Sequence, residues 1–155
     1  MNMFIYESAV EIRASREHVW PLLVGSVMVL PAPLLLRLGL PRPVACRLSP
    51  DGQSRECLTS RGRIWQRILE RRAPEVLAFE RESDTVGLRY WLRSMRDSFT
   101  LERTQLGMRL TRRTQVEPRI FAGPLLRLAL RVIHRYVHRN FKLLAEREPQ
   151  EAPTP

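Results

Sequence analysis

The strongest constraint in the sequence is a long amphipathic segment near the C-terminus, residues 125–146. At about 100° per residue, its apolar side chains fill one half of a helical circumference. They are Leu125, Leu126, Ala129, Leu130, Val132, Ile133, Tyr136, Val137, Phe141, Leu143 and Leu144. The other half, which we expect to face solvent, holds Arg127, Arg131, His134, Arg135, His138, Arg139 and Lys142. So wide an apolar face needs a broad partner, and a curved antiparallel sheet would supply one.

The chain before this helix has the patterns of β-strands. Alternating or short apolar runs bounded by turn residues predict seven strands. They cover residues 4–13, 44–48, 55–60, 63–71, 76–81, 90–103 and 108–116. Ser15 is placed to cap a short helix after the first strand. Residues 26–40 are apolar and interrupted by proline, so we expect one or two short helical turns there. The fold class is therefore α+β.

Length and composition set the class of molecule. The 155 residues suit one domain, expected over residues 1–147, with a disordered tail over 148–155. Apolar residues make up 44% and charged residues 27%, which excludes a disordered chain and a polytopic membrane protein. The most apolar stretch, residues 19–41, contains several prolines and Arg37, and the N-terminus lacks the pattern of a signal peptide. We therefore expect a cytoplasmic protein.

The chain is strongly basic, with 26 Lys and Arg residues against 16 Asp and Glu. The net charge of +10 would favour nucleic acid, an anionic membrane or an acidic protein. The arginines are spread along the whole chain, however, and this favours an ordinary solvated surface. The two cysteines, Cys46 and Cys57, form no CxxC pair. They could meet on adjacent strands, but we expect two reduced, partly buried thiols.

The order of strand, short helices, strands and long final helix resembles the START-like or helix-grip superfamily (SRPBCC), which includes polyketide cyclase/dehydrase and lipid-transport proteins. The phrase VEIRASREHVWPLL, residues 10–23, is similar to the opening strand and helix of that superfamily. The phrase FTLERTQLGMRLTRRTQVEP, residues 99–118, is similar to its penultimate hairpin, although Gly107-Met108 replaces the usual Gly-Thr. The resemblance implies a seven-stranded antiparallel sheet wrapped around the long C-terminal helix, with two short helices after the first strand and an enclosed cavity.

Members of this superfamily bind sterols, phospholipids, quinones, polyketides or plant hormones, and a minority are enzymes. They share no catalytic motif that could be carried over residue by residue. The site must therefore be argued from the side chains that would face the cavity.

The hairpin over residues 90–116 contains the most informative polar pair. A four-residue loop, residues 104–107, pairs Arg103 with Met108. This register places Asp97 opposite Thr114 and diagonal to Arg112, on the apolar side of the sheet. Buried charges are rare unless they are paired. Asp97 and Arg112 are therefore candidates for a polar anchor in an apolar pocket, or alternatively for a structural ion pair.

Strand alternation and helix periodicity identify the other residues expected to line the cavity. The full set of expected ligand-binding residues is Tyr6, Ile64, Gln66, Ile68, Phe79, Met95, Asp97, Phe99, Leu110, Arg112, Leu126, Leu130, Ile133, Tyr136 and Val137. Tyr136 and its neighbour on the helix, Asn140, carry polar groups that need a partner when buried. That partner is a ligand hydroxyl, a backbone carbonyl or water.

Other motifs add little. His134 and His138 have metal-chelating spacing, but they lie among the arginines and lack the glutamate of HExxH. The sequence has no GxSxG, P-loop or GxGxxG phrase. We therefore expect no metal and no cofactor. The stripe Arg127, Arg131, Arg135 and Arg139 lacks the interleaved aromatic residues that read single-stranded bases.

Three functions remain open. The first is binding or transport of a hydrophobic small molecule, such as a lipid, quinone or polyketide-like compound, by a monomer or homodimer. The second is a cyclase/dehydrase-type enzyme, with Asp97 as general base and Arg112 stabilising an oxyanion. Because an adjacent arginine makes a carboxylate a weaker base, binding is favoured. The third is an interaction protein whose arginine surface binds ribosome, RNA or membrane. Nucleic acid is the less favoured partner. An anionic membrane is the other candidate, because the apolar, proline-interrupted segment contains Leu34, Leu35, Leu36 and Leu38, together with Arg37 and the nearby Arg42. The same leucines could instead gate the cavity.

Overall fold

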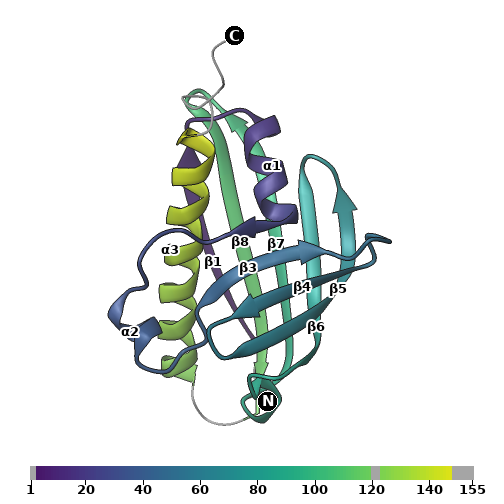
Figure 1. Cartoon of the computed structure of the whole chain (residues 1–155), viewed down its shortest axis with the longest axis vertical. Helices are drawn as coiled ribbons and strands as arrows, with labels where there is room; N and C mark the ends of the chain where they lie inside the picture. Colours follow the sequence, from purple (N-terminus) through teal and green to yellow (C-terminus); the bar gives the residue numbers. More distant parts are fainter. Residues whose placement is uncertain (1–2, 120–122, 148–155) are drawn as a thin grey trace.

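The computed structural model describes residues 3–119 and 123–147. These residues form one curled antiparallel sheet of eight strands in the spatial order β1-β8-β7-β6-β5-β4-β3-β2. The long helix α3 lies along the sheet beside β1, and α1 and α2 lie on the same side (Figure 1). The strands are β1 (Phe4–Ile12), β2 (Ser26–Val27), β3 (Pro43–Leu48), β4 (Ser54–Thr59), β5 (Gly62–Arg72), β6 (Val76–Asp84), β7 (Leu92–Thr104) and β8 (Gly107–Pro118). The helices are α1 (Arg16–Val24), α2 (Leu34–Arg37), the 3₁₀ helix η1 (Leu88–Tyr90) and α3 (Gly123–Arg147).

The sheet has one strand more than the sequence predicted. All seven predicted strands are present, but the segment that begins at Ser26 contributes the short edge strand β2 before α2. Ser26 pairs with Cys46 and Val27 with Ala45. Two residues cannot show an alternating pattern, which is why the seven-stranded prediction was wrong by this strand.

The two cysteines are bonded to each other, contrary to the expectation of reduced thiols. Cys46 on β3 lies directly opposite Cys57 on β4, with a Cα–Cα distance of 4.1 Å. Paired residues of an antiparallel ladder place their side chains on the same face of the sheet. The register therefore brings the two sulfur atoms together, which the spacing in the sequence could not establish.

The β7–β8 hairpin has the predicted register. Arg103 pairs with Met108 and Asp97 with Thr114. The turn requires glycine at position 107, where φ is +145° and a Cβ atom would lie 2.4 Å from the carbonyl oxygen of Ile12. This tight approach lets β1 pair with β8 from Met108 to Val116.

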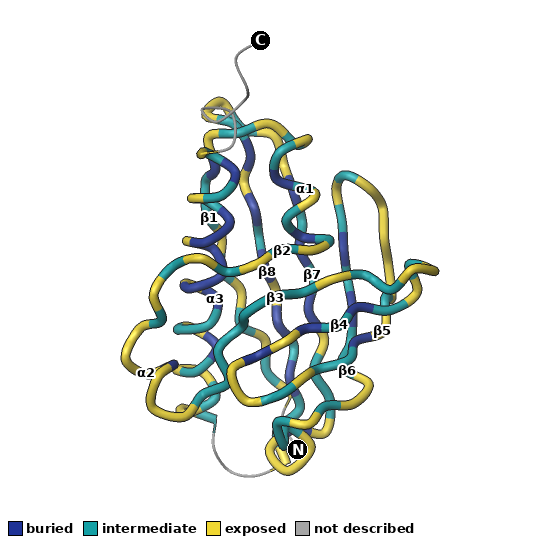
Figure 2. Tube along the Cα trace, viewed as in Figure 1, coloured by how far each residue is buried: buried dark blue, intermediate teal, exposed yellow. Residues whose placement is uncertain are grey.

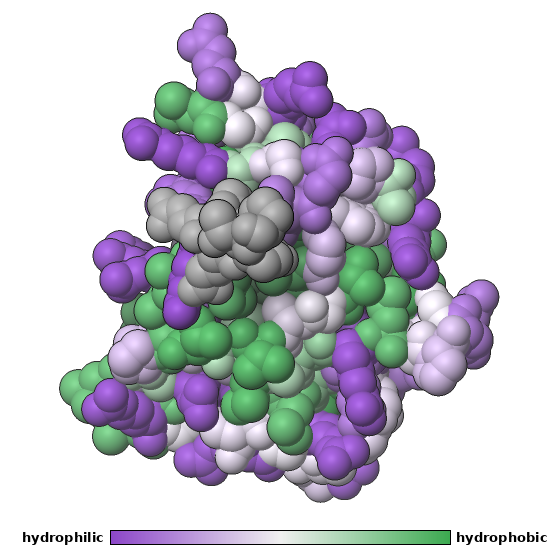
Figure 3. All heavy atoms as spheres, turned by 45° about the horizontal axis from the view of Figure 1, so that its top comes forward, coloured by the Kyte–Doolittle hydropathy of each residue, from purple (hydrophilic) through white to green (hydrophobic). Residues whose placement is uncertain are grey.

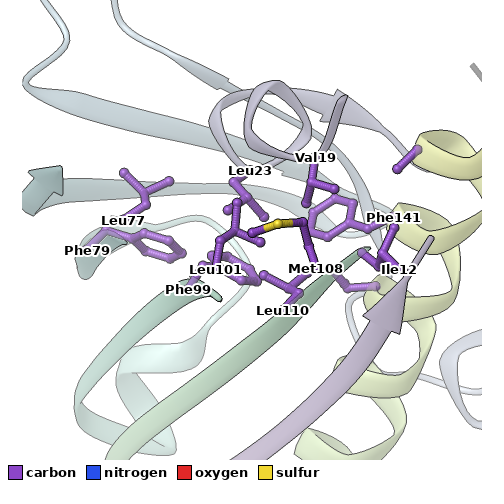
Figure 4. Packing of buried hydrophobic residues seen from close by; sticks show 12 residues of the cluster. Ile12, Val19, Leu23, Leu77, Phe79, Phe99, Leu101, Met108, Leu110 and Phe141 are labelled. Carbon is purple, nitrogen blue, oxygen red and sulfur yellow. The ribbon is translucent and has the colours of Figure 1, made fainter. Parts of the chain in front are cut away.

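The core fills the end of the molecule at which α1 lies. Val19 and Leu23 of α1 pack against side chains from β6, β7 and β8 and from the C-terminal part of α3 (Figure 4). The ring of Phe99 lies between the rings of Phe79 and Phe141, with centroids 6.0 and 5.9 Å away. A second, smaller cluster of Leu92, Val116 and Leu130 occupies the other end. Figure 2 shows these buried positions along the strands and on one side of α3.

Two further observations complete the fold. None of the described helices is both long enough and apolar enough to span a membrane. The predicted tail, residues 148–155, lies outside the described residues.

Candidate functional site

A cavity of about 430 Å³ lies between α3 and the sheet, bordered by both hydrophobic clusters. One wall is the apolar face of α3, which contributes Leu126, Ala129, Leu130, Ile133, Val137 and Phe141. These residues are three or four apart, so they project from one side of the helix. The opposite wall comes from strands β3 to β8, and Met28 and residues 39–41 close part of the perimeter. The cavity is therefore a product of the same helix periodicity that predicts the fold.

The predicted polar pair lies in this cavity. Arg112 Nε donates to Asp97 Oδ1 over 3.1 Å, and both side chains are at least nine-tenths buried. Thr114, directly opposite Asp97, donates its hydroxyl to the same carboxylate oxygen. The guanidinium carbon of Arg112 also lies 5.3 Å from the centre of the Phe99 ring. The carboxylate of Asp97 is thus held by two donors and faces an apolar chamber.

A second ion pair lies on β6 in the cavity wall. Arg81 Nη1 donates to Asp84 Oδ2 over 3.0 Å. The other carboxylate oxygen of Asp84 accepts backbone N–H groups of Val86, Gly87 and Leu88. Asp84 therefore anchors the turn into η1 and also balances the charge of Arg81.

A third buried arginine has no carboxylate of its own. Arg55 on β4 is 5% exposed and donates Nη1 to the neutral side chain of Gln66 over 3.1 Å. Its guanidinium carbon lies 4.4 Å from the centre of the Phe79 ring. Burial, together with the nearby charge of Arg112, lowers the pKa of Arg55 to about 10. Its group still carries a positive charge at neutral pH.

Behind the cavity wall, a chain of hydrogen bonds connects Asp97 to two histidines of α3. His134 Nε2 lies 2.7 Å from Thr114 Oγ1, and His134 Nδ1 lies 2.6 Å from Ser8 Oγ. Ser8 Oγ also lies 2.8 Å from His138 Nε2. His134 and His138 are 1% and 5% exposed, so the expectation that they share the solvent-facing side with the arginines was wrong. The polar side of α3 includes a strip that packs against β1, where Ser8 supplies a polar partner.

The ionised carboxylate fixes the direction of every bond in this chain. Asp97 can only accept, so the hydroxyl of Thr114 donates to it and accepts from His134 Nε2–H. Neutral His134 then accepts at Nδ1 from Ser8, which in turn accepts from His138 Nε2–H. His138 Nδ1 is left as a bare acceptor, and no partner for it occurs among the described residues. The chain thus assigns one tautomer to each histidine.

Burial keeps both histidines neutral. Desolvation, followed by the charge of Arg112, lowers the pKa of His134 to about 2 and that of His138 to about 4. Within the described part of the chain, no group of three or more His, Cys, Asp or Glu side chains is arranged to hold a metal ion.

The segment before α2 is fastened to α3 by polar side chains. Asn140 Oδ1 accepts the backbone N–H groups of Val29 and Leu30 over 2.7 and 2.9 Å. The hydroxyl of Tyr136 donates to the carbonyl oxygen of Leu30 over 2.8 Å. Beyond this attachment, Leu34 and Leu38 are about 70% exposed. Figure 3 shows hydrophobic side chains gathered on the surface at the side of the molecule where α2 lies.

The structure places two thirds of the predicted binding residues around the cavity. These are Ile64, Gln66, Met95, Asp97, Phe99, Arg112, Leu126, Leu130, Ile133 and Val137. The other five predicted residues do not line the cavity. Ile68, Phe79 and Leu110 pack in the core below α1, because Val19 and Leu23 fill that end of the sheet. The ring of Tyr6 lies edge-on against His134, and the hydroxyl of Tyr136 is taken by Leu30.

Sequence reasoning missed several residues of the cavity wall, above all Arg55 and Arg81. Strand alternation could have identified both residues as inward-facing. Arg55 alternates with Cys57 and Thr59 on β4, and Arg81 continues the inward series of Leu77 and Phe79 on β6. Neither charged side chain was among the residues expected to line the cavity.

Comparisons with known proteins found similar solved structures but no similar sequences. Neither a protein-family model nor a curated protein sequence matches the chain. Among solved structures, the Zhui aromatase/cyclase from Streptomyces sp. R1128 is similar, with a TM-score of 0.70 and 15% identity over 99% of this chain and 100% of that chain. A START superfamily protein from Mycobacterium smegmatis has a TM-score of 0.67 and 10% identity over 93% of this chain and 98% of that chain.

A third similar structure is the di-domain ARO/CYC BexL from the BE-7585A biosynthetic pathway. Its TM-score is 0.65 and its identity 12%, over 93% of this chain and 50% of the BexL chain. The present chain therefore spans about half the length of BexL. These similarities show that the protein has the START-like helix-grip fold.

Proposed function

We propose that this protein binds an apolar or aromatic small molecule in the cavity between α3 and the sheet. The observation that carries the proposal is the cavity itself, since about 430 Å³ lies within the range of roughly 300–1,000 Å³ for ligand sites. Its walls are mainly apolar, with a few fixed polar groups, which is the usual composition of a small-molecule site. The similar START and aromatase/cyclase structures support a ligand-binding role for the fold.

The segment from Met28 to Pro41 is the proposed gate. Met28, Leu40 and Pro41 contribute to the cavity wall, whereas Leu34 and Leu38 between them face outward. The attachment of Leu30 to Tyr136 and Asn140 fixes one end of this segment. The other end is held at Arg42, whose backbone hydrogen-bonds to Ser60. A displacement of residues 31–41 between these two attachments would open the cavity without disturbing the sheet.

The test is a fluorescence titration with N-phenyl-1-naphthylamine, a neutral probe whose emission rises in apolar surroundings. Ala129 lines the cavity, whereas its neighbour Leu128 is 44% exposed and does not. We expect saturable binding to the native protein and to Leu128→Trp, and at least ten-fold weaker binding to Ala129→Trp. Equal binding to both variants, with intact folding by circular dichroism, would contradict the proposal.

A cyclase-type activity is the second candidate, and the placement of Asp97 favours it. An aldol cyclisation would begin when this carboxylate removes a proton from a carbon next to a carbonyl group. The resulting carbanion would add to a second carbonyl carbon of the same molecule, and Arg112 would stabilise the alkoxide until it takes the proton back. Dehydration would then release water.

This candidate makes a separate claim from ligand binding. Cyclisation of a poly-β-ketone substrate should be lost in Asp97→Asn, while N-phenyl-1-naphthylamine should still bind that variant. Absence of turnover by the native protein, or turnover that survives the substitution, would exclude this mechanism.

A further inference from the structure

The charges in the cavity wall do not balance. Among the described residues, the buried guanidinium groups are those of Arg55, Arg81 and Arg112, and each of the last two has a carboxylate partner. The fourth lining arginine, Arg61, is exposed at the rim. One buried positive charge, that of Arg55, is therefore left without a counterion in the described structure.

The strand register explains why Arg55 forms no ion pair with Asp84 or Asp97. Arg55, Gln66 and Arg81 stand in one row across β4, β5 and β6, so a neutral amide separates the two arginines. Asp97 lies on β7, one strand beyond this row, and its carboxylate is already engaged by Arg112 and Thr114, so its charge attracts Arg55 without forming an ion pair with it. Asp84 is engaged by Arg81 and three backbone N–H groups. Both carboxylates are thus committed to other donors.

Two buried N–H groups of the cavity wall also lack hydrogen-bond acceptors in the described part of the chain. The Nε–H of Arg55 is buried and has no acceptor among the described residues, and the same is true of Arg81. A buried donor without a partner is unfavourable, and a buried charge without a partner is more so. Native proteins rarely keep both at one place unless something else binds there.

A negatively charged ligand would bind beside Arg55 more tightly than a neutral ligand of the same shape. The guanidinium group of Arg55 has already lost its water on folding, so an incoming anion must shed only its own hydration. A guanidinium presents a planar set of donors that matches an oxyanion such as a carboxylate. The apolar face of α3 is available for the remainder of the molecule.

We propose that the ligand carries a single oxyanionic head group, such as a carboxylate, which pairs with Arg55 while the apolar or aromatic body of the ligand lies along α3. This inference rests on the proposed ligand-binding function and deepens it, because it names the chemical class of the ligand. It separates anionic amphiphiles from neutral lipids, sterols and quinones.

Two probes that differ by one oxyanion test the inference. 8-Anilino-1-naphthalenesulfonate is N-phenyl-1-naphthylamine with an added sulfonate group, so the two probes share one aromatic body and differ by a single anionic group. Each is titrated against the native protein, Arg55→Met, Arg113→Met and Ala129→Trp. Methionine keeps the length and apolar stem of arginine, and Arg113 is an exposed residue of β8 whose loss changes the net charge equally. The Ala129→Trp variant reports binding of the anion to the basic surface outside the cavity.

We expect the native protein and Arg113→Met to bind the sulfonate at least ten-fold more tightly than the neutral probe, which corresponds to about 1.4 kcal/mol. Arg55→Met should lose this preference and keep its affinity for the neutral probe. Equal affinities in the native protein would overturn the inference without requiring any variant to fold. A preference that persists in Arg55→Met or in Ala129→Trp would also overturn it. Binding of neither probe would contradict the proposed function itself, and the inference with it.

Discussion

Acidification should destabilise this protein well before its carboxylates titrate, because His134 and His138 are buried in the neutral form. Both folded pKa values, about 2 and about 4, lie below the ordinary histidine value of 6.5. The unfolded chain therefore takes up protons first as the pH falls below 6.5. The stability associated with neutral histidines is fully present above pH 6.5 and is lost progressively down to the folded pKa values.

The magnitude follows from linkage. At pH 5, the solution is 1.5 units below the ordinary histidine value of 6.5, and each unit corresponds to about 1.4 kcal/mol for each histidine. Each side chain then contributes a loss of about 2 kcal/mol between pH 8 and pH 5, or about 4 kcal/mol for the pair. That is a large part of a typical unfolding free energy of roughly 5–15 kcal/mol.

The assay is urea denaturation at pH 8, 7, 6 and 5 at constant ionic strength, followed by tryptophan fluorescence. His138→Gln is the matched control, because a glutamine amide can still donate to Ser8 but does not titrate. Its loss of unfolding free energy between pH 8 and pH 5 should be about half that of the native protein. An unfolding free energy that stays constant or rises between pH 8 and pH 5 would refute the argument that both histidines are buried and neutral.

Three further changes should have separable effects on stability. Phe99→Ala should lower the unfolding free energy by about 3–5 kcal/mol, because the ring is 1% exposed between Phe79 and Phe141; a loss below about 1 kcal/mol in denaturation would contradict this packing. Reduction of the Cys46–Cys57 disulfide, which closes a loop with a sequence separation of 11, should cost about 3 kcal/mol; an unchanged urea midpoint after dithiothreitol would count against a structural role. Asp97→Ala should cost about 3–5 kcal/mol, since it leaves Arg112 buried without its carboxylate. Glu70→Ala, which breaks the exposed pair with Arg72, should cost less than about 1 kcal/mol, and similar losses for these two variants would refute the distinction.

The sequence was sufficient where one periodic pattern extended over many residues. The apolar spacing of residues 125–146 predicted α3 and most of the helix wall of the cavity. In the β7–β8 hairpin, a short loop fixed the register, and the register then placed Asp97 beside Thr114 and within reach of Arg112. In both cases, local geometry determines contacts between residues that are close in sequence.

Contacts between distant segments were beyond the same reasoning. The burial of His134 and His138 depends on Ser8, which lies more than 120 positions away on β1. The separation of Phe79 and Leu110 from the cavity depends on how α1 seats over the sheet. The pairing of Cys46 with Cys57 depends on the register of β3 and β4, which no tight turn fixed in the sequence. Each of these outcomes is set by tertiary packing.

A crystal structure of the native protein with bound N-phenyl-1-naphthylamine tests the central claim most directly. We expect electron density for the probe between α3 and the sheet, in contact with Phe99, Ile133 and Val137. Density on the outer surface, with the space around these three side chains closed, would show that the cavity is not the binding site.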